Sequence, residues 1–146
     1  YFSEKSTVTV TLGVDTPGTV ELPMLEAISL ESTMKNKRGF VFHTGGSVRG
    51  LDFVPKPSDT DFEYLAVGGY NEKNERHFLH EKQEPGSYHN CIQIWRADLQ
   101  LESERSAIML DMCILHDFGV VQDLKWCLFG GYREVPLATH YVTARN

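Results

Sequence analysis

The sequence predicts an all-β protein, and three observations support this prediction. Apolar residues fall in short runs that alternate with polar positions, as they do in strands that expose one face. Glycine or proline separates many of these runs, and both residues favour turns. No segment sustains the 3.6-residue apolar stripe of a long amphipathic helix. Several short strands joined by turns are typical of a sandwich, a barrel or a propeller.

The strands are expected in the following order. Residues 6–12 alternate β-branched and small side chains, which is typical of a half-exposed strand. A turn, a short extended piece and a break at Pro23 come next. Residues 24–34 fit either one helical turn or a strand, and the sequence does not decide between them. Further strands are expected at 38–43, 47–54, 63–69, 91–97, 107–116, 120–129 and 139–144.

Two polar segments interrupt the strands. Residues 70–90 carry mixed charges and a Pro-Gly turn, and a loop of this length is usually functional or disordered. Residues 98–106 form a shorter charged connection. The charges of the longer loop are expected to solvate it, with docking of a partner as the alternative. These charged residues are Glu72, Lys73, Glu75, Arg76, Glu81, Lys82 and Glu84.

Composition excludes several classes of function. The chain has 146 residues and a net charge of -6, so affinity for nucleic acid through charge alone is not expected. No apolar run reaches the roughly 18 residues of a membrane span. The odd, widely spaced cysteines Cys91, Cys113 and Cys127 predict buried reduced thiols and a reducing compartment. The chain begins with Tyr1 instead of Met, and we expect it to be a fragment of a longer protein.

A repeat is visible within the chain. Residues 43–55, HTGGSVRGLDFVP, align with residues 116–128, HDFGVVQDLKWCL, at a constant offset of 73 residues. Both copies follow a β-rich run, and five positions match in character. The matching pairs are His43 with His116, Gly46 with Gly119, Val48 with Val121, Leu51 with Leu124 and Phe53 with Trp126.

The repeated unit resembles the WD40 repeat. A histidine turn is followed by a strand with Val-x-x-Leu-x-aromatic, then by YLAVGG, then by a strand that ends at Trp95. Arg96 stands where the signature has Asp, and the turn Asp that pairs with the histidine in the family has no clear counterpart. WD40 repeats are about 40–45 residues long, and the two polar segments account for the excess. The His-Thr-Gly-Gly turn lacks the Lys-Ser/Thr of a phosphate-binding loop and leads into no helix.

The resemblance implies a WD40-type β-propeller fragment, with about one and a half to two blades in this incomplete chain. Residues 1–37 would be N-terminal strands and a connector, and residues 38–146 would form the blades with a long insertion at 70–90. We expect replacement of Phe53 or Trp126 by alanine to cost about 3–5 kcal/mol of stability, and replacement of Gly46 to strain the backbone. The residues expected to pack the inner strands are Leu51, Phe53, Leu65, Val67, Ile92, Ile94 and Trp95, with Trp126 also in the core.

Residues 38–131 look like one branch of this family, the fungal WD40 subunits of the RNA polymerase III general transcription factor IIIC. This resemblance implies a non-catalytic scaffold in the subcomplex that recognises the B-box of tRNA genes. It implies protein subunits as partners, contact with DNA only indirectly, no membrane, no small-molecule substrate, no cofactor and a nuclear location. An adaptor in another nuclear or cytoplasmic complex is the alternative within the same fold.

A metal-dependent hydrolase on another all-β scaffold is the alternative outside the WD40 family. Three histidines and a cysteine (His77, His80, His89, Cys91) lie close in sequence, but their spacing matches no established zinc pattern. Three acids (Asp52, Asp111, Asp123) are expected at strand surfaces or turns, because no paired acid or histidine accompanies them. We therefore assign no catalytic, cofactor-binding or metal-binding residue.

Overall fold

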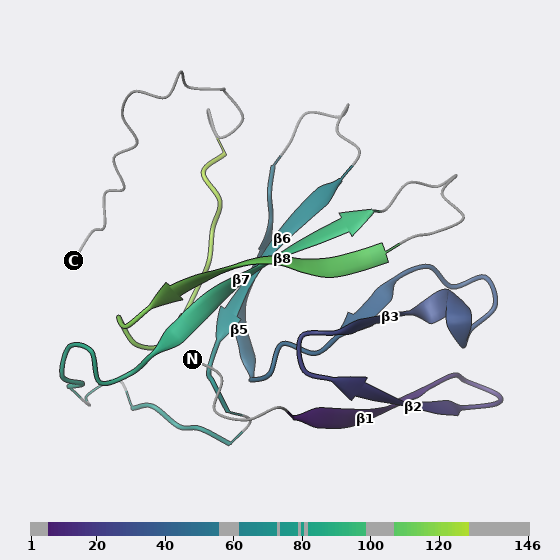
Figure 1. The fold of residues 1–146 in the computed structure, drawn as a ribbon, viewed down its shortest axis with the longest axis horizontal. Helices are drawn as coiled ribbons and strands as arrows, with labels where there is room; N and C mark the ends of the chain where they lie inside the picture. The colour runs from purple at the N-terminus through teal and green to yellow at the C-terminus, as the bar shows by residue number, and fades with distance from the viewer. Residues whose placement is uncertain are drawn as a thin grey trace.

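The computed structural model describes residues 6–55, 62–72, 74–78, 80, 82–98 and 107–128, and the prediction of an all-β protein is confirmed. Two antiparallel hairpins precede a four-stranded antiparallel sheet, and the described residues contain no closed barrel (Figure 1). The hairpins are formed by β1 (Thr7–Leu12) with β2 (Gly18–Pro23) and by β3 (Ala27–Ser29) with β4 (Phe40–Phe42). The sheet consists of β5 (Val48–Phe53), β6 (Glu63–Gly69), β7 (Asn90–Asp98) and β8 (Ala107–His116).

The four-stranded sheet follows the order of the chain, β5-β6-β7-β8, with every neighbouring pair antiparallel. β6 and β8 have the same bounds as the strands predicted at 63–69 and 107–116. The segment 24–34 contains both predicted alternatives, since β3 is followed by a single 3-10 turn, Leu30–Ser32. The strand predicted at 139–144 lies outside the described residues.

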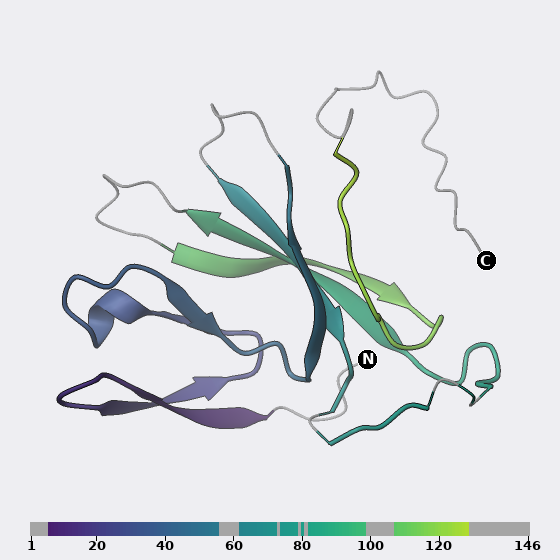
Figure 2. The same ribbon diagram turned by 180° about the vertical axis from the view of Figure 1, so that it is seen from behind.

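One face of the sheet holds the hydrophobic core. Leu65 and Val67 point to the same face, and the register places Trp95 beside Leu65. Trp95 is fully buried, and the Phe42 ring of β4 lies 4.5 Å from its ring. Figure 2 shows the two hairpins together on one side of the sheet, with the β3–β4 hairpin nearer to it. Because β3 precedes residue 37 and β4 follows it, this hairpin pairs a strand from the predicted N-terminal unit (1–37) with a strand from the predicted blade unit (38–146).

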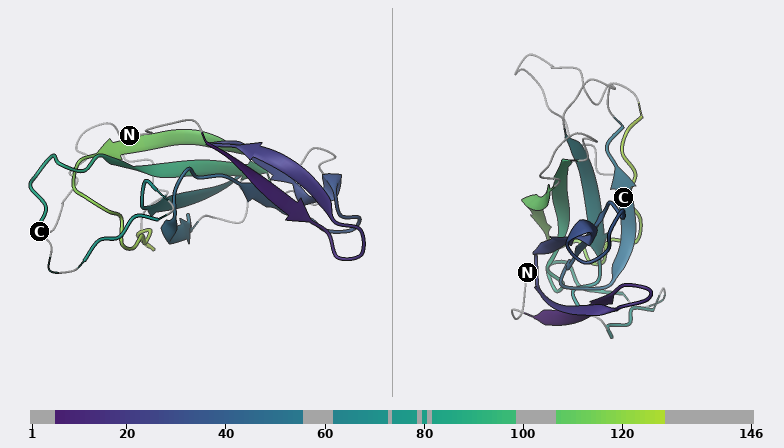
Figure 3. Two further views of the ribbon diagram at one scale, coloured as in Figure 1. Left: turned by 90° about the horizontal axis from the view of Figure 1, so that it is seen from below. Right: turned by 90° about the vertical axis from the view of Figure 1, so that its right-hand side faces the viewer.

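The extended segment 120–128 lies against the opposite face, alongside β5 and β6 (Figures 1 and 3). A Cβ atom on Gly68 would come within 2.8 Å of the Val121 side chain, so the missing side chain is what lets the two backbones approach. The Trp126 backbone N–H donates to Asp52 Oδ2 at 2.8 Å, and its indole N–H donates to the Asp52 carbonyl at 3.1 Å. The segment predicted as a strand at 120–129 is extended over residues 120–128 but pairs with no other strand among the described residues.

Part of the predicted core is also wrong. Leu51 and Phe53 of β5 are about half exposed, at 46% and 50%, because the β3–β4 hairpin packs on the face mainly over β7 and β8. Ile92 is partly buried, whereas Leu65, Val67, Ile94 and Trp95 are buried as expected. Trp126 is half-buried. The large loss of stability expected from truncating Phe53 is therefore expected at Trp95 instead, because Trp95 has no exposed surface.

Candidate functional site

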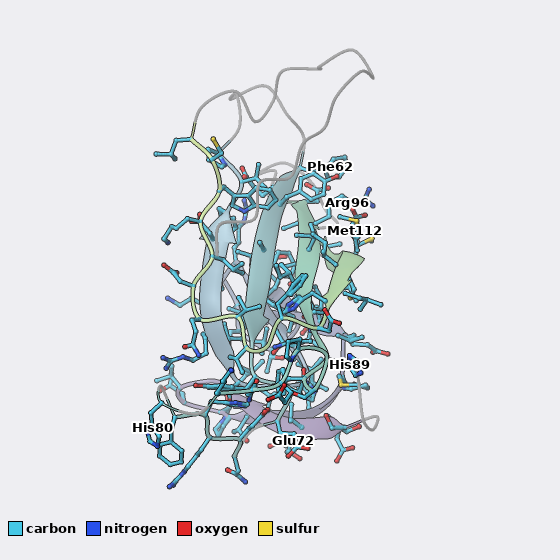
Figure 4. All side chains as sticks on the ribbon, turned by 90° about the vertical axis from the view of Figure 1, so that its left-hand side faces the viewer. Phe62, Glu72, His80, His89, Arg96 and Met112 are labelled. Atoms are coloured by element: carbon cyan, nitrogen blue, oxygen red, sulfur yellow. The ribbon has the colours of Figure 1, made fainter. Side chains whose placement is uncertain are left out.

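Three connections meet at one end of the four-stranded sheet, which we call the loop end. They are the turn 43–47 before β5, the insertion 70–89 between β6 and β7, and the turn 117–119 after β8. The antiparallel order places the first residue of β5, the last of β6, the first of β7 and the last of β8 at this end. Figure 4 shows Glu72 and His80 at this end, and Phe62, Arg96 and Met112 at the other.

Buried polar side chains of β7 hold the loop end together. The Asn90 amide N–H donates to the Gly69 carbonyl at 2.6 Å, and the Gln93 amide N–H donates to the Thr44 carbonyl at 2.6 Å. The Trp95 indole N–H donates to Gln93 Oε1 at 3.0 Å, so Gln93 links the core to the turn before β5. The family resemblance gave no reason to single out Asn90 or Gln93. Their polar character within an apolar strand is the signal that marks them, since a buried amide requires partners.

The paired histidines of the repeat are similar in one respect. His43 Nδ1 and His116 Nε2 are buried and make no hydrogen bond in the described structure. Burial lowers the pKa of His116, against the opposing effect of Asp117, and this favours a neutral ring at pH 7. The turns that follow them each contain one glycine in the left-handed region, Gly45 at φ 89° and Gly119 at φ 91°, so the backbone pairs Gly119 with Gly45 and not with Gly46 as the constant offset predicted.

The insertion is organised around the Glu75 carboxylate. Glu75 Oε2 accepts hydrogen bonds from the backbone N–H of Asn71 at 3.1 Å, from that of Glu72 at 3.2 Å and from the Tyr88 hydroxyl at 2.8 Å. Its other oxygen, Oε1, pairs with His77 Nε2. The insertion was expected to be a solvated loop, but its Glu75 carboxylate is bound within the protein by these hydrogen bonds. Two of its other charged residues, Lys73 and Glu81, lie outside the described residues.

The His77 imidazole is enclosed by partners on several sides. Gln83 Nε2 donates to His77 Nδ1 at 2.7 Å, which leaves His77 Nε2 to donate to Glu75. The Tyr70 ring stacks parallel to the imidazole at 5.4 Å, and the Tyr88 ring meets it edge-on at 5.0 Å. Both ring nitrogens are thus engaged within the protein, which leaves neither of them to bind a metal.

Glu75 is a carboxylate stabilised in its charged form. Burial acts to raise its pKa, but hydrogen bonds from His77, Tyr88 and the backbone of Glu72 outweigh burial and lower it. For Tyr88 the effect is the reverse, since burial and the neighbouring carboxylate raise the pKa of the phenol. The insertion therefore depends on a charged Glu75 and a neutral Tyr88.

Replacing Glu75 with glutamine should loosen the insertion and remove part of its dependence on pH. A lowered folded-state pKa means that the carboxylate stabilises the fold above its unfolded pKa of about 4.3. This stability is then lost as the pH falls through the lowered value. The protection factors of the amides of residues 70–89, which compare each exchange rate with that of an unstructured chain at the same pH, should fall in the wild type as the pH drops below the unfolded pKa of about 4.3. In Glu75→Gln exchange should already be fast at pH 7, and equal protection of both proteins at pH 7 would contradict this.

The residues considered for metal binding are not brought together. His77, His80, His89 and Cys91 form no cluster, and the described residues hold no group of three His, Cys, Asp or Glu placed to bind one ion. Figure 4 shows His80 and His89 on opposite sides of the loop end. Cys91 is buried instead within the sheet.

The candidate acids have structural partners or lie on the surface. Asp52 accepts the hydrogen bond from the Trp126 backbone, and Asp123 Oδ1 accepts one from the backbone N–H of Leu124 at 2.9 Å. Asp111 is exposed where the β7–β8 register shifts. These three side chains therefore do not converge on a common site.

The three cysteines are free, but only one is fully buried. Cys91 is buried, Cys113 partly buried and Cys127 exposed, so the prediction of buried thiols is wrong for Cys127. Burial raises the pKa of Cys91 to about 11, with the adjacent Cys113 thiol adding to the effect. Burial also raises the pKa of Cys113. Both thiols are thus protonated and unreactive at neutral pH.

Comparison with known proteins finds a relative for most of the chain. This relative is the transcription factor tau subunit sfc6 of Schizosaccharomyces pombe, and the chain is 26% identical to it over 130 residues. The chain resembles a transcription-factor subunit. The match covers 87% of this chain and 20% of the relative, so the chain spans about a fifth of that protein's length. No family model and no solved structure match the chain.

The described residues contain no helix long and apolar enough to cross a membrane. Among the same residues, Asp52 and Asp123 accept hydrogen bonds from the backbone of segment 120–128, and His77 is bound to Glu75 and Gln83. What the loop end offers is a surface of hydrogen-bonded loops carried on a sheet. Such surfaces recognise other molecules through shape and exposed side chains.

Proposed function

We propose that this chain is part of a WD40-type β-propeller that acts as a non-catalytic scaffold in a transcription-factor complex for RNA polymerase III genes. The similarity to the tau subunit sfc6 over 130 residues carries the proposal. The fold is compatible with it, because a four-stranded antiparallel meander is the unit of a propeller blade. In this proposal residues 1–37 cover one face of the first blade, and residues 38–146 hold the blades and the insertion.

Exposed apolar side chains on both faces of the sheet support the propeller. Val48, Leu51 and Phe53 of β5 are exposed beside the core on one face. On the opposite face Met109, Met112 and Ile114 of β8 are exposed where segment 120–128 does not reach. In a propeller each sheet is flanked by two others, which would bury these side chains and remove their contact with water.

The segment 120–128 supports the same arrangement. It begins after the second histidine turn, at the position of the repeat that corresponds to β5 in the first copy. It also packs on the sheet through Val121 and Trp126. We infer that it is the first strand of the next blade, whose own neighbours complete its ladder.

The proposed complex defines the partners of the protein and its location in the cell. The partners are protein subunits of the assembly that recognises the B-box of tRNA genes, and DNA is contacted only through them. The net charge of -6 supports this, because an acidic surface repels the phosphate backbone. The protein acts in the nucleus and requires no cofactor.

Purification of the full-length protein under native conditions tests the proposal. Mass spectrometry of the purified assembly should recover other subunits of the RNA polymerase III transcription factor in constant ratio. A stable complex with unrelated proteins only would favour an adaptor of another assembly and would overturn the proposal.

A further inference from the structure

A cavity of about 360 Å³ lies between the insertion and the turn after β8. Glu84, Gly86 and Tyr88 line it from the insertion, and Asp117, Phe118 and Gly119 line it from the turn. Tyr88 and Phe118 form an isolated parallel bridge, so the two walls are joined through their backbones. Because Tyr88 also donates to Glu75, the cavity is held by the same contacts that organise the insertion.

Two side-chain oxygens approach glycines across the cavity. A Cβ atom on Gly86 would lie 3.6 Å from Asp117 Oδ2, and one on Gly119 would lie 3.5 Å from Gln83 Oε1. The two walls are therefore close to van der Waals contact where they meet. The Asp117 carboxylate and the Gln83 amide oxygen thus lie directly beside the two glycine backbones at the cavity wall.

The lining of the cavity carries negative charge next to an aromatic surface. Glu84 and Asp117 contribute two carboxylates, whereas no lysine, arginine or histidine is among the described lining residues. Phe118 is 90% exposed, and His116, which stacks on it at 6.1 Å, has a pKa lowered by burial. Carboxylates beside an aromatic face form the environment that binds a guanidinium or ammonium group.

The surface continues beyond this cavity. A smaller one of about 180 Å³ shares Gln83, Phe118 and Gly119 with it and is bounded by Phe78, which is also exposed. The second cavity is also lined by His77. Because the two cavities share Gln83, Phe118 and Gly119, a peptide that crosses both would place a basic side chain beside Asp117 and a neighbouring side chain beside Phe118 and Phe78.

We propose that this groove binds an arginine-containing segment of a partner protein. The inference rests on the proposed function, since it assumes that the chain works through protein contacts. Arginine is favoured over lysine because its planar guanidinium pairs with a carboxylate through two hydrogen bonds and also stacks on an aromatic ring. The groove thereby supplies a specific contact that the exposed apolar faces of the sheet do not.

Peptide binding to the full-length protein tests the groove. The probes are the blocked peptides Gly-Ser-Arg-Leu-Ser-Gly, its lysine and glutamine analogues, and its glutamate analogue, titrated by calorimetry. The arginine peptide should bind more tightly than the lysine peptide, and the other two should not bind. Asp117→Asn should weaken the arginine peptide about tenfold through loss of a charge-assisted contact. Phe118→Ala should weaken it about threefold.

Matched controls separate the groove from the general acidity of the chain. Asp15→Asn makes the same change in charge at an exposed turn, and Val14→Ala truncates a side chain that is also 90% exposed. Both should leave the affinity within about twofold of the wild type. Equal weakening by Asp15→Asn and Asp117→Asn, or equal binding of the arginine and glutamine peptides, would overturn the groove.

The two proposals fail separately. Absence of peptide binding in a protein that still co-purifies with transcription-factor subunits would overturn the groove and leave the function standing. Peptide binding that depends on Asp117, in a protein that co-purifies with none of those subunits, would overturn the function and leave the groove.

Discussion

Replacing Trp95 with alanine is expected to lower the free energy of unfolding by about 3–5 kcal/mol. Trp95 has no exposed surface, and its ring packs with Leu65, Val67 and Phe42, which tie β6, β7 and the β3–β4 hairpin together. Its removal leaves a large cavity and deprives Gln93 of the indole N–H. Urea unfolding followed by far-UV circular dichroism measures the change.

Two controls define the cause of this loss. Trp95→Phe keeps most of the ring volume and loses the indole hydrogen bond, so it should cost clearly less than the alanine variant. Phe118→Ala truncates an aromatic ring that is 90% exposed, and it should change the stability by less than about 0.5 kcal/mol. A Trp95→Ala loss as small as that of Phe118→Ala would show that the face shared by β6 and β7 is not the core.

Replacing Gly46 with alanine is expected to cost about 2–3 kcal/mol of stability. The reason differs from the backbone strain expected from the sequence, because φ of Gly46 is not in the left-handed region. A Cβ atom there would instead overlap the carbonyl oxygen of Tyr70. The turn before β5 would have to move away from the end of β6, and with it the bond from Gln93 to Thr44.

A glycine with more room is the control for this variant. A Cβ atom on Gly18 in β2 would meet the Thr33 methyl group at 3.0 Å and the Leu12 carbonyl oxygen only at 4.0 Å, and a side chain can move more easily than a backbone. Gly18→Ala should therefore change the stability by about 1 kcal/mol or less. Thermal unfolding of the two variants compares them directly, and an equal cost at both positions would show that the Tyr70 contact is not responsible.

Several features of the fold could be predicted from local sequence alone. Alternation of apolar and polar residues, with glycine or proline between the runs, placed β6 and β8 at their observed bounds. The pattern works because side chains on a strand point alternately to opposite faces. The two histidine turns were also visible in the sequence, although the left-handed glycine of the first turn is Gly45 and not the Gly46 that the alignment paired with Gly119.

Burial was less predictable. Leu51 and Phe53 have the spacing of core residues, but their exposure depends on which element covers β5. The β3–β4 hairpin contacts the sheet nearer to β8, and only the packing of two distant segments decides this. The same holds for segment 120–128, whose apolar residues predict a strand but which lies against the sheet without joining a ladder.

By itself the sequence determined the all-β class, most strand positions and the repeated histidine turn, because these depend on residues near one another in the chain. Tertiary structure decided the character of the insertion. Its charges predicted a solvated loop, yet the side chains of Glu75, His77 and Tyr88 converge in space and shield one another from solvent. The groove beside Asp117 and Phe118 was decided in the same way, since its walls come from segments about 30 residues apart that only folding brings together.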